Sequence, residues 1–307
     1  GGNTMTWRSL LISRPAKLSL QQQHLLIQQE ESIPVPLEDI AVIVVESREV
    51  VITTPLLSAC AQNGITLLTC DEQFLPCGQW LPFAQYHRSL KILRQQMNMT
   101  QPQKKQLWQQ IVKQKIRNQA WMLDYSGHDI ASGRLNALAD EVKSGDKGYA
   151  EGQAAALYFP LLFGDAFTRS SESGINACLN YGYSIIRSAV ARALVQYGFL
   201  PALGLHHRSE LNPFNLADDF IEPYRPIVDL LAYEHLSSDG LKDTLTPEFK
   251  RKLIELLCHQ ILLDKQKYSV LSAIDRTIQS FQTALSENNP KLLKLPQMLP
   301  LKVHTYE

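Results

Sequence analysis

The chain has 307 residues, 45% of them hydrophobic and 20% charged, and its 30 basic residues balance 30 acidic ones. A formal net charge of zero excludes a polycation that coats nucleic acid over its whole surface. No run of eighteen uncharged apolar residues is present, so the sequence predicts no membrane span. The length predicts two domains of ordinary globular composition.

The N-terminal residues and the cysteines predict a reduced, cytoplasmic protein. Residues 1–4, which precede Met5, look like an expression remnant. The first domain is not preceded by a basic segment followed by an apolar one, so we expect no secretion signal. The cysteines are scattered, odd in number and without C-x-x-C spacing, which fits reduced thiols and argues against a zinc site. They are Cys60, Cys70, Cys77, Cys178 and Cys258.

Residues 5–85 are predicted to form a small β-rich domain. Its clearest strand is 40–45, a β-branched run that we expect to be buried on both faces. Thr53 is predicted to begin a short helix over 56–62, and residues 65–70 return as a strand. This part contains no constellation of groups that suggests chemistry. We therefore expect it to serve dimer formation and the docking of partners.

From residue 86 the period of the apolar residues becomes helical, and 86–289 is predicted to be a larger all-α domain. Within 88–117 there are eight basic residues and no acidic one, which indicates either a solvated helix face or a surface that meets DNA phosphates. The overall prediction is an α+β fold with the β-rich domain first. The cations predicted to contact DNA are Arg88, Lys91, Arg94, Lys104, Lys105, Lys113 and Lys115, with Arg187 on a later helix and Arg208 beside a histidine pair.

Glu151 is the first acidic candidate for a functional site. It follows a turn rich in small residues at 144–148 and precedes a run of small and apolar residues typical of a close-packed helix. A carboxylate that faces inward on such a helix needs a partner. After an irregular stretch at 159–174, a long helix is predicted from Ile175 to about Gly198.

Residues 205–226 place two imidazoles and several carboxylates close together in the sequence. Asp219 and Glu222 are three residues apart, so they would share one face of a helix, while His207 is far enough away to come from another element. A histidine and carboxylates that converge in this way can hold a divalent cation with open positions. The alternative is a solvated acidic helix face on which Glu222 pairs with Arg225.

The remaining chain is predicted to be helical over 227–236, 247–263 and 272–285. A proline-containing tail over 290–307 follows, and we expect it to become ordered against a partner. No Walker loop or G-x-G-x-x-G motif is present, so no nucleotide fuel is expected. Ser209 and Cys178 have no defined base, which argues against a serine or cysteine nucleophile.

Four blocks in one order carry a family resemblance. They are residues 149–159 around Glu151, 180–186 (Asn-Tyr-Gly-Tyr-Ser-Ile-Ile), 204–207 (Gly-Leu-His-His) and 219–226 (Asp-Phe-Ile-Glu-Pro-Tyr-Arg-Pro). Together they resemble CRISPR-associated protein one, the integrase of prokaryotic adaptive immunity, and most of all its form in type II systems. The resemblance extends over nearly the whole chain.

The resemblance implies a catalytic metal site in the helical domain. Glu151, His207 and Glu222 would be the catalytic residues and the ligands of Mn²⁺ or Mg²⁺, with Asp219 the second choice for the last ligand. The activity implied is integration of short DNA fragments into a CRISPR array, by transesterification from 3′-OH ends, with an associated DNA endonuclease activity. The partners implied are DNA, a second copy of the chain, CRISPR-associated protein two and the type II effector nuclease.

Three other functions remain open on the residues alone. A structure-specific DNA nuclease could use the same metal site, with water in place of a DNA hydroxyl. A DNA-binding scaffold without catalysis could carry the acidic cluster as a structural feature. A mononuclear iron oxygenase is the most distant, because its site takes two histidines and one carboxylate.

Overall fold

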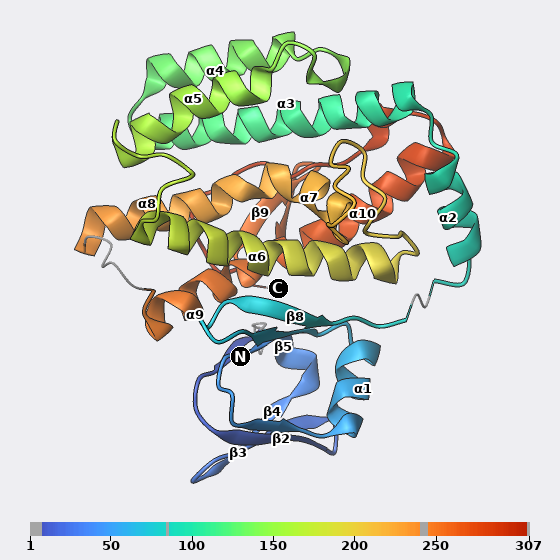
Figure 1. Cartoon of the computed structure of the whole chain (residues 1–307), viewed down its shortest axis with the longest axis vertical. Helices are drawn as coiled ribbons and strands as arrows, with labels where there is room; N and C mark the ends of the chain where they lie inside the picture. Colours follow the sequence, from blue (N-terminus) through green and yellow to red (C-terminus); the bar gives the residue numbers. More distant parts are fainter. Residues whose placement is uncertain (1–7, 84–85, 240–244, 306–307) are drawn as a thin grey trace.

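In the computed structural model, residues 8–83, 86–239 and 245–305 are described, so the predicted expression remnant at 1–4 lies outside these ranges. The first part of the chain is rich in strands and forms the lower part of the molecule in Figure 1. Its elements are β1 (Arg8–Ile12), β2 (Ala16–Gln21), β3 (His24–Gln28), β4 (Ser32–Pro36), β5 (Ile40–Val45), β6 (Val50–Ile52), α1 (Thr54–Gln62), β7 (Thr66–Cys70) and β8 (Pro76–Trp80).

The strands of this part form two four-stranded sheets within the described residues, in the orders β1-β5-β7-β8 and β4-β3-β2-β6. Strand β5 is buried along its whole length, as the β-branched run at 40–45 predicts. One face of it, with Ile43 and Val45, joins a core with Leu18 and Leu25 of the other sheet and Leu56 of α1. The opposite face, with Val42 and Val44, joins the core of the helical part. This central strand therefore connects the two parts of the molecule.

The larger part of the chain is helical, which confirms the prediction of an α+β fold with a β-rich N-terminal part. Figure 1 shows α3, α4 and α5 farthest from the sheets, with α6 and α8 between them and the β-rich part. The helices are α2 (Ser89–Met97), α3 (Gln101–Tyr125), α4 (Asp129–Glu141), α5 (Ala150–Phe163), α6 (Gly174–Gln196), α7 (Asn215–Ile221), α8 (Arg225–Asp239), α9 (Pro247–Glu255) and α10 (Val270–Ser286).

Helix α3 is the long element against which the site is built. It begins with a capping box in which Thr100 and Gln103 bond each other's backbone N–H groups, and Pro102 occupies the first turn, where it interrupts no helical hydrogen bond. Its apolar residues are buried, and it packs against α4, α5 and the 3₁₀ turn η3 (Glu222–Tyr224). Segments distant in the sequence therefore meet on one helix.

The end of the chain differs from the helical prediction for 247–263. Helix α9 ends at Glu255, and the chain continues as a hairpin of β9 (Gln260–Leu263) and β10 (Gln266–Ser269). The turn residues Asp264 and Lys265 both have positive φ, the conformation of tight hairpin turns. The segment after residue 290 also packs on its own chain, through bridges from Val303 to His259 and from Gln297 to Leu262. The expectation that it needs a partner for order is therefore wrong.

Among the described residues no helix has the length and apolar character needed to cross a membrane.

A buried ion pair joins the two parts of the molecule. Nζ of Lys250 in α9 lies 3.2 Å from Oε2 of Glu46, which follows β5, and the two side chains are 7% and 10% exposed. Removing one member of a buried pair leaves the other charge without compensation. Lys252 on the same helix offers a comparison, because its 4.0 Å pair with Glu248 is solvent-exposed.

We expect Lys250→Ala to lower the free energy of unfolding by about 3 kcal/mol, because Glu46 would stay buried without a partner. The matched exposed variant Lys252→Ala should change it by less than about 1 kcal/mol. Urea unfolding of both variants measures the difference. Equal effects of the two substitutions would contradict a role for the pair in holding the two parts together.

Candidate metal centre

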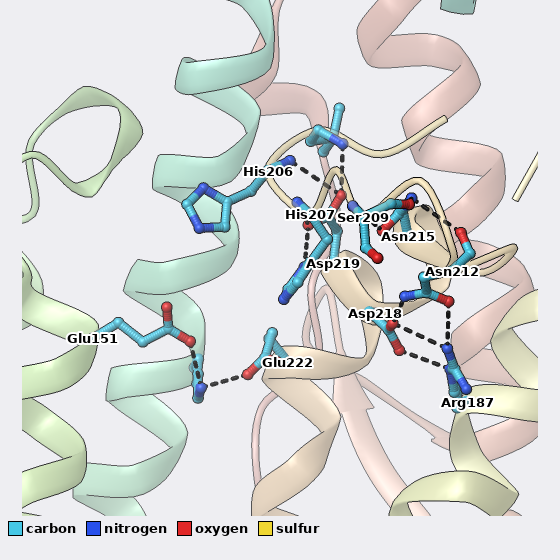
Figure 2. Close-up of polar contacts among 12 residues, drawn as sticks. Glu151, Arg187, His206, His207, Ser209, Asn212, Asn215, Asp218, Asp219 and Glu222 are labelled. Atoms are coloured by element: carbon cyan, nitrogen blue, oxygen red, sulfur yellow. Dashed lines mark hydrogen bonds and ion pairs between the residues drawn. The ribbon is translucent and has the colours of Figure 1, made fainter. Parts of the chain in front are cut away.

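Glu151 lies in the first turn of α5, where the chain leaves a tight turn. The carboxylate of Asp146 accepts hydrogen bonds from the backbone N–H groups of Ala150 (2.8 Å) and Glu151 (3.1 Å). Asp146 therefore satisfies donors that the start of a helix leaves open, and its charge is favourable there. The backbone of Glu151 is fixed by this capping, while its side chain extends toward α3, as Figure 2 shows.

Glu222 is buried and begins η3, directly after α7. Its Oε1 accepts a hydrogen bond of 2.9 Å from Nε of Arg225, one turn along the chain. Its Oε2 contacts Nζ of Lys115 in α3 and, apart from this ion pair, has no hydrogen-bonding partner in the described chain. Burial alone would raise the pKa of Glu222, but Lys115 and Arg225 outweigh burial and lower it. The carboxylate is therefore held ionised.

Lys115 brings the two glutamates together. Its Nζ lies 2.6 Å from Oε1 of Glu151 and also contacts Glu222, and its side chain is only 12% exposed. Burial would lower the pKa of this ammonium, yet the charges of Glu222 and Glu151 raise it. Two carboxylates from different elements thus share one positive charge.

His207 is oriented by Asp219, which is fully buried. The carboxylate of Asp219 accepts hydrogen bonds from the backbone N–H groups of Leu205, His206 and His207 and lies 2.7 Å from Nδ1 of the His207 ring. Gly204 permits this close arrangement, since a Cβ there would collide with the carbonyl oxygen of His207. One carboxylate therefore fixes the loop and the imidazole together.

The hydrogen bond with Asp219 decides which nitrogen of His207 is available. A carboxylate accepts the proton of Nδ1–H, so Nε2 is left for a ligand, as in carboxylate–histidine–metal arrangements. This hydrogen bond, against the opposing effect of burial, raises the pKa of His207, and the charge of Glu222 adds to the rise. In Figure 2 the ring of His207 and the carboxylates of Glu151 and Glu222 are directed toward one region beside α3.

The donor set fits a divalent cation, although the side chains as they stand do not surround one. Within residues 8–83, 86–239 and 245–305 no group of three His, Cys, Asp or Glu side chains is arranged to hold a metal ion. The ammonium of Lys115 lies between the carboxylates of Glu151 and Glu222, which are the groups that would have to bind the metal ion. Two carboxylates that already share a cation, with one imidazole nitrogen nearby, are the ligand types that Mn²⁺ and Mg²⁺ accept.

The cations predicted from the sequence to contact DNA differ in exposure. Lys115 is buried against Glu151 and Glu222 and is not on a surface that DNA could contact. The prediction that it binds DNA is therefore wrong. Arg187 pairs with Asp218 at 2.7 Å. The side chains of Arg88, Lys91, Arg94, Lys105 and Arg208 are exposed, and those of Lys104 and Lys113 are half-buried.

Two residues that organise the site were not predicted as site residues. Asn215 fixes the loop before α7: its side chain accepts from the N–H of Ser209 and donates to the carbonyl oxygens of Ala202, Ser209 and Asn212. Figure 2 shows this side chain inside the loop. Trp108 of α3 stacks on the exposed ring of His206, with 4.3 Å between the ring centroids. The position of Trp108 in the middle of the basic segment at 88–117 was the sequence feature that could have indicated this role.

A second buried network extends from Glu222 to Asp229 in α8. The guanidinium of Arg225 lies 4.5 Å from the ring centroid of Tyr183, and the Tyr183 hydroxyl donates to Asp229. The hydroxyl of Tyr158 in α5 donates to the other oxygen of Asp229 at 2.8 Å. Burial raises the pKa of Asp229 to about 6, against the smaller lowering effect of these hydrogen bonds. This network connects α5, α6 and α8 next to Glu222, the partner of Arg225.

Comparison with known proteins gives one consistent result. The family model "CRISPR associated protein Cas1" matches residues 10–257. A CRISPR-associated endonuclease Cas1 from Neisseria meningitidis serogroup C is 61% identical over 304 residues, which cover 99% of this chain and 100% of that one.

Two solved structures have a similar fold. A casposase bound to its integration product has a TM-score of 0.74 at 17% identity, with 92% of this chain and 91% of that one covered. A Cas6-RT-Cas1–Cas2 complex contains a chain with a TM-score of 0.71 at 20% identity. The match covers 97% of this chain but 37% of that much longer one.

We expect Asp229→Asn to become more stable relative to the wild type as the pH rises. A folded-state pKa of about 6 against the ordinary 3.8 means that the proton on Asp229 stabilises the fold fully below pH 3.8 and that this contribution is lost as the pH passes 6. The difference corresponds to about 2 kcal/mol between pH 4 and pH 7. Asparagine has no such proton to lose.

Urea unfolding of both proteins across this pH range measures the effect, with the exposed Asp140→Asn as the control. If the free energies of unfolding of Asp229→Asn and the wild type run parallel from pH 4 to pH 7, the Asp229 carboxyl does not titrate as the structure requires.

Proposed function

The chain belongs to the CRISPR-associated protein Cas1 family, and from this premise we propose that it is a metal-dependent DNA integrase of CRISPR adaptation. Its reaction would be transesterification, in which the 3′-OH end of a short DNA fragment attacks a phosphodiester of the CRISPR repeat. The associated endonuclease activity would use water in place of the hydroxyl. The observation that carries the proposal is the pair of glutamates at one buried cation position, beside a histidine oriented by Asp219.

Glu151, Glu222 and Nε2 of His207 would hold Mn²⁺ or Mg²⁺. A divalent cation in such a site polarises a phosphodiester and lowers the pKa of an attacking hydroxyl. The residues of the chain supply the positioning on which phosphoryl transfer depends. Asp219 keeps the proton of His207 on Nδ1, Arg225 orients Glu222, and Asp146 fixes the start of the helix that carries Glu151. Asp219 thus has a positioning role and is not proposed as a ligand.

DNA would approach over the exposed cations of the basic segment and over Arg208. Arg88, Lys91 and Arg94 lie at the start of α2 and along it with exposed side chains, and Lys105 is exposed near the start of α3. Phosphate contacts of this kind position DNA without reading its sequence. Arg208 hydrogen-bonds Gln101 at 2.8 Å and would meet DNA next to His207. Lys104, Lys113 and Arg187 are less open and would contribute less.

The proposed assembly follows from the family. The Cas6-RT-Cas1–Cas2 complex supports a partnership with CRISPR-associated protein two, and the casposase with its integration product supports DNA joining as the reaction. We also propose a homodimer formed through the β-rich part, and cooperation with a type II effector nuclease. The reaction would take place in the cytoplasm, where the CRISPR array lies.

We expect the purified protein, with its Cas2 partner and Mn²⁺, to join a fluorescent DNA fragment to a CRISPR repeat. Glu151→Gln, His207→Ala and Glu222→Gln should each lower the rate at least about 100-fold, because loss of outer-shell partners alone costs about 10- to 100-fold. Glu210→Gln, an exposed glutamate three residues after His207, is the matched control. Chelation with EDTA should abolish joining.

The products separate the alternatives. Cleavage of branched DNA without joining would favour a structure-specific nuclease at the same site. If the wild type binds DNA but neither joins nor cuts it, and the three variants lose stability, a DNA-binding scaffold is the correct description.

A further inference from the structure

Lys115 differs from every other cation of the basic segment in its surroundings. It follows the buried residues Ile111 and Val112 on α3 and precedes the buried Ile116, and its side chain is 12% exposed. An ammonium in such a place is costly unless partners compensate its charge. Its partners are Glu151 and Glu222, the two carboxylates proposed above as metal ligands. In Figure 2 the dashed lines from both glutamates meet at one nitrogen.

The four side chains linked directly through Lys115 and Glu222 carry balanced charges. Glu151 and Glu222 carry two negative charges, and Lys115 and Arg225 carry two positive ones. A divalent cation added beside a retained ammonium would leave an excess of two positive charges in a largely buried space, where repulsion is poorly screened. The carboxylate oxygens that would bind the cation are also the atoms that Lys115 contacts. Metal and ammonium therefore compete for the same position.

We propose that Lys115 is the internal counter-ion of the metal site: its ammonium occupies the metal position, holds both glutamates in place, and is displaced when a divalent cation binds. This inference rests on the proposed function. Glu151 is the more open of the two glutamates, 28% exposed against 5%, so the exchange takes place on its side. Arg225 remains on Oε1 of Glu222 throughout and keeps that carboxylate oriented.

The affinity for metal is set by this competition, so removal of the ammonium strengthens metal binding. We expect Lys115→Met to bind Mn²⁺ at least about tenfold more tightly than the wild type, in calorimetric titrations of the complete chain. The metal-free variant unfolds at a lower temperature than the wild type, because Glu151 and Glu222 then repel each other without a shared cation. Saturating Mn²⁺ consequently raises its melting temperature more than that of the wild type.

Two further variants complete the test. Lys147→Met removes an exposed lysine four residues before Glu151 that makes no ion pair in the described part of the chain, and it leaves the Mn²⁺ affinity unchanged. Lys115→Arg keeps the positive charge and folds with the pair intact, and its forked guanidinium holds both carboxylates more firmly. It therefore binds Mn²⁺ several-fold more weakly than the wild type, which keeps the test decisive if Lys115→Met fails to fold.

The outcomes separate this inference from the proposed function. If the wild type binds Mn²⁺ through Glu151, His207 and Glu222, and neither Lys115 variant changes the affinity in the stated direction, Lys115 is a structural cation and only this inference fails. If the wild type binds no Mn²⁺, or binds it equally well after Glu151→Gln and Glu222→Gln, the metal site and the counter-ion role fail together.

Discussion

The candidate site depends on one electrostatic constraint: two carboxylates from separate elements share one largely buried space. Two acidic side chains can share such a space only if cations lie between or beside them. Lys115 meets this condition between Glu151 and Glu222, and Arg225 meets it on the far oxygen of Glu222. These contacts link α3, α5 and η3 at the site. The same constraint makes the space attractive to a divalent cation.

The orientation of the histidine has a separate origin. Asp219 is buried within α7, and its carboxylate accepts hydrogen bonds from three consecutive backbone N–H groups of the preceding loop, those of residues 205–207. The ring of His207 completes this set of donors. A loop held in this way presents Nε2 without the entropic cost of ordering it on binding. Rigid second-layer contacts of this kind are what functional sites need to hold side chains in place. The network from Arg225 through Tyr183 to Asp229 supports Glu222, because Arg225 is also the hydrogen-bonding partner of that carboxylate.

Local patterns were sufficient to predict most of the fold, and the family resemblance singled out Glu151, His207 and Glu222, but neither predicted the contacts between distant segments. The buried strand β5 and the capped helix α3 follow from β-branched runs, helical periods and cap residues. Lys113 and Lys115 look alike in the sequence, and only the approach of α5 and η3 makes one of them a buried partner of glutamates. The hairpin at 260–269 was missed because a short apolar run fits a helix as well as a strand.

A crystal structure of the protein grown with Mn²⁺, with anomalous diffraction recorded at the manganese edge, tests the central claim most directly. The account predicts one strong anomalous peak from a manganese ion bound by Glu151, Glu222 and Nε2 of His207. The ammonium of Lys115 should have moved out of that position. A structure at saturating Mn²⁺ in which Lys115 still bridges the two glutamates, or in which manganese binds elsewhere, would contradict it.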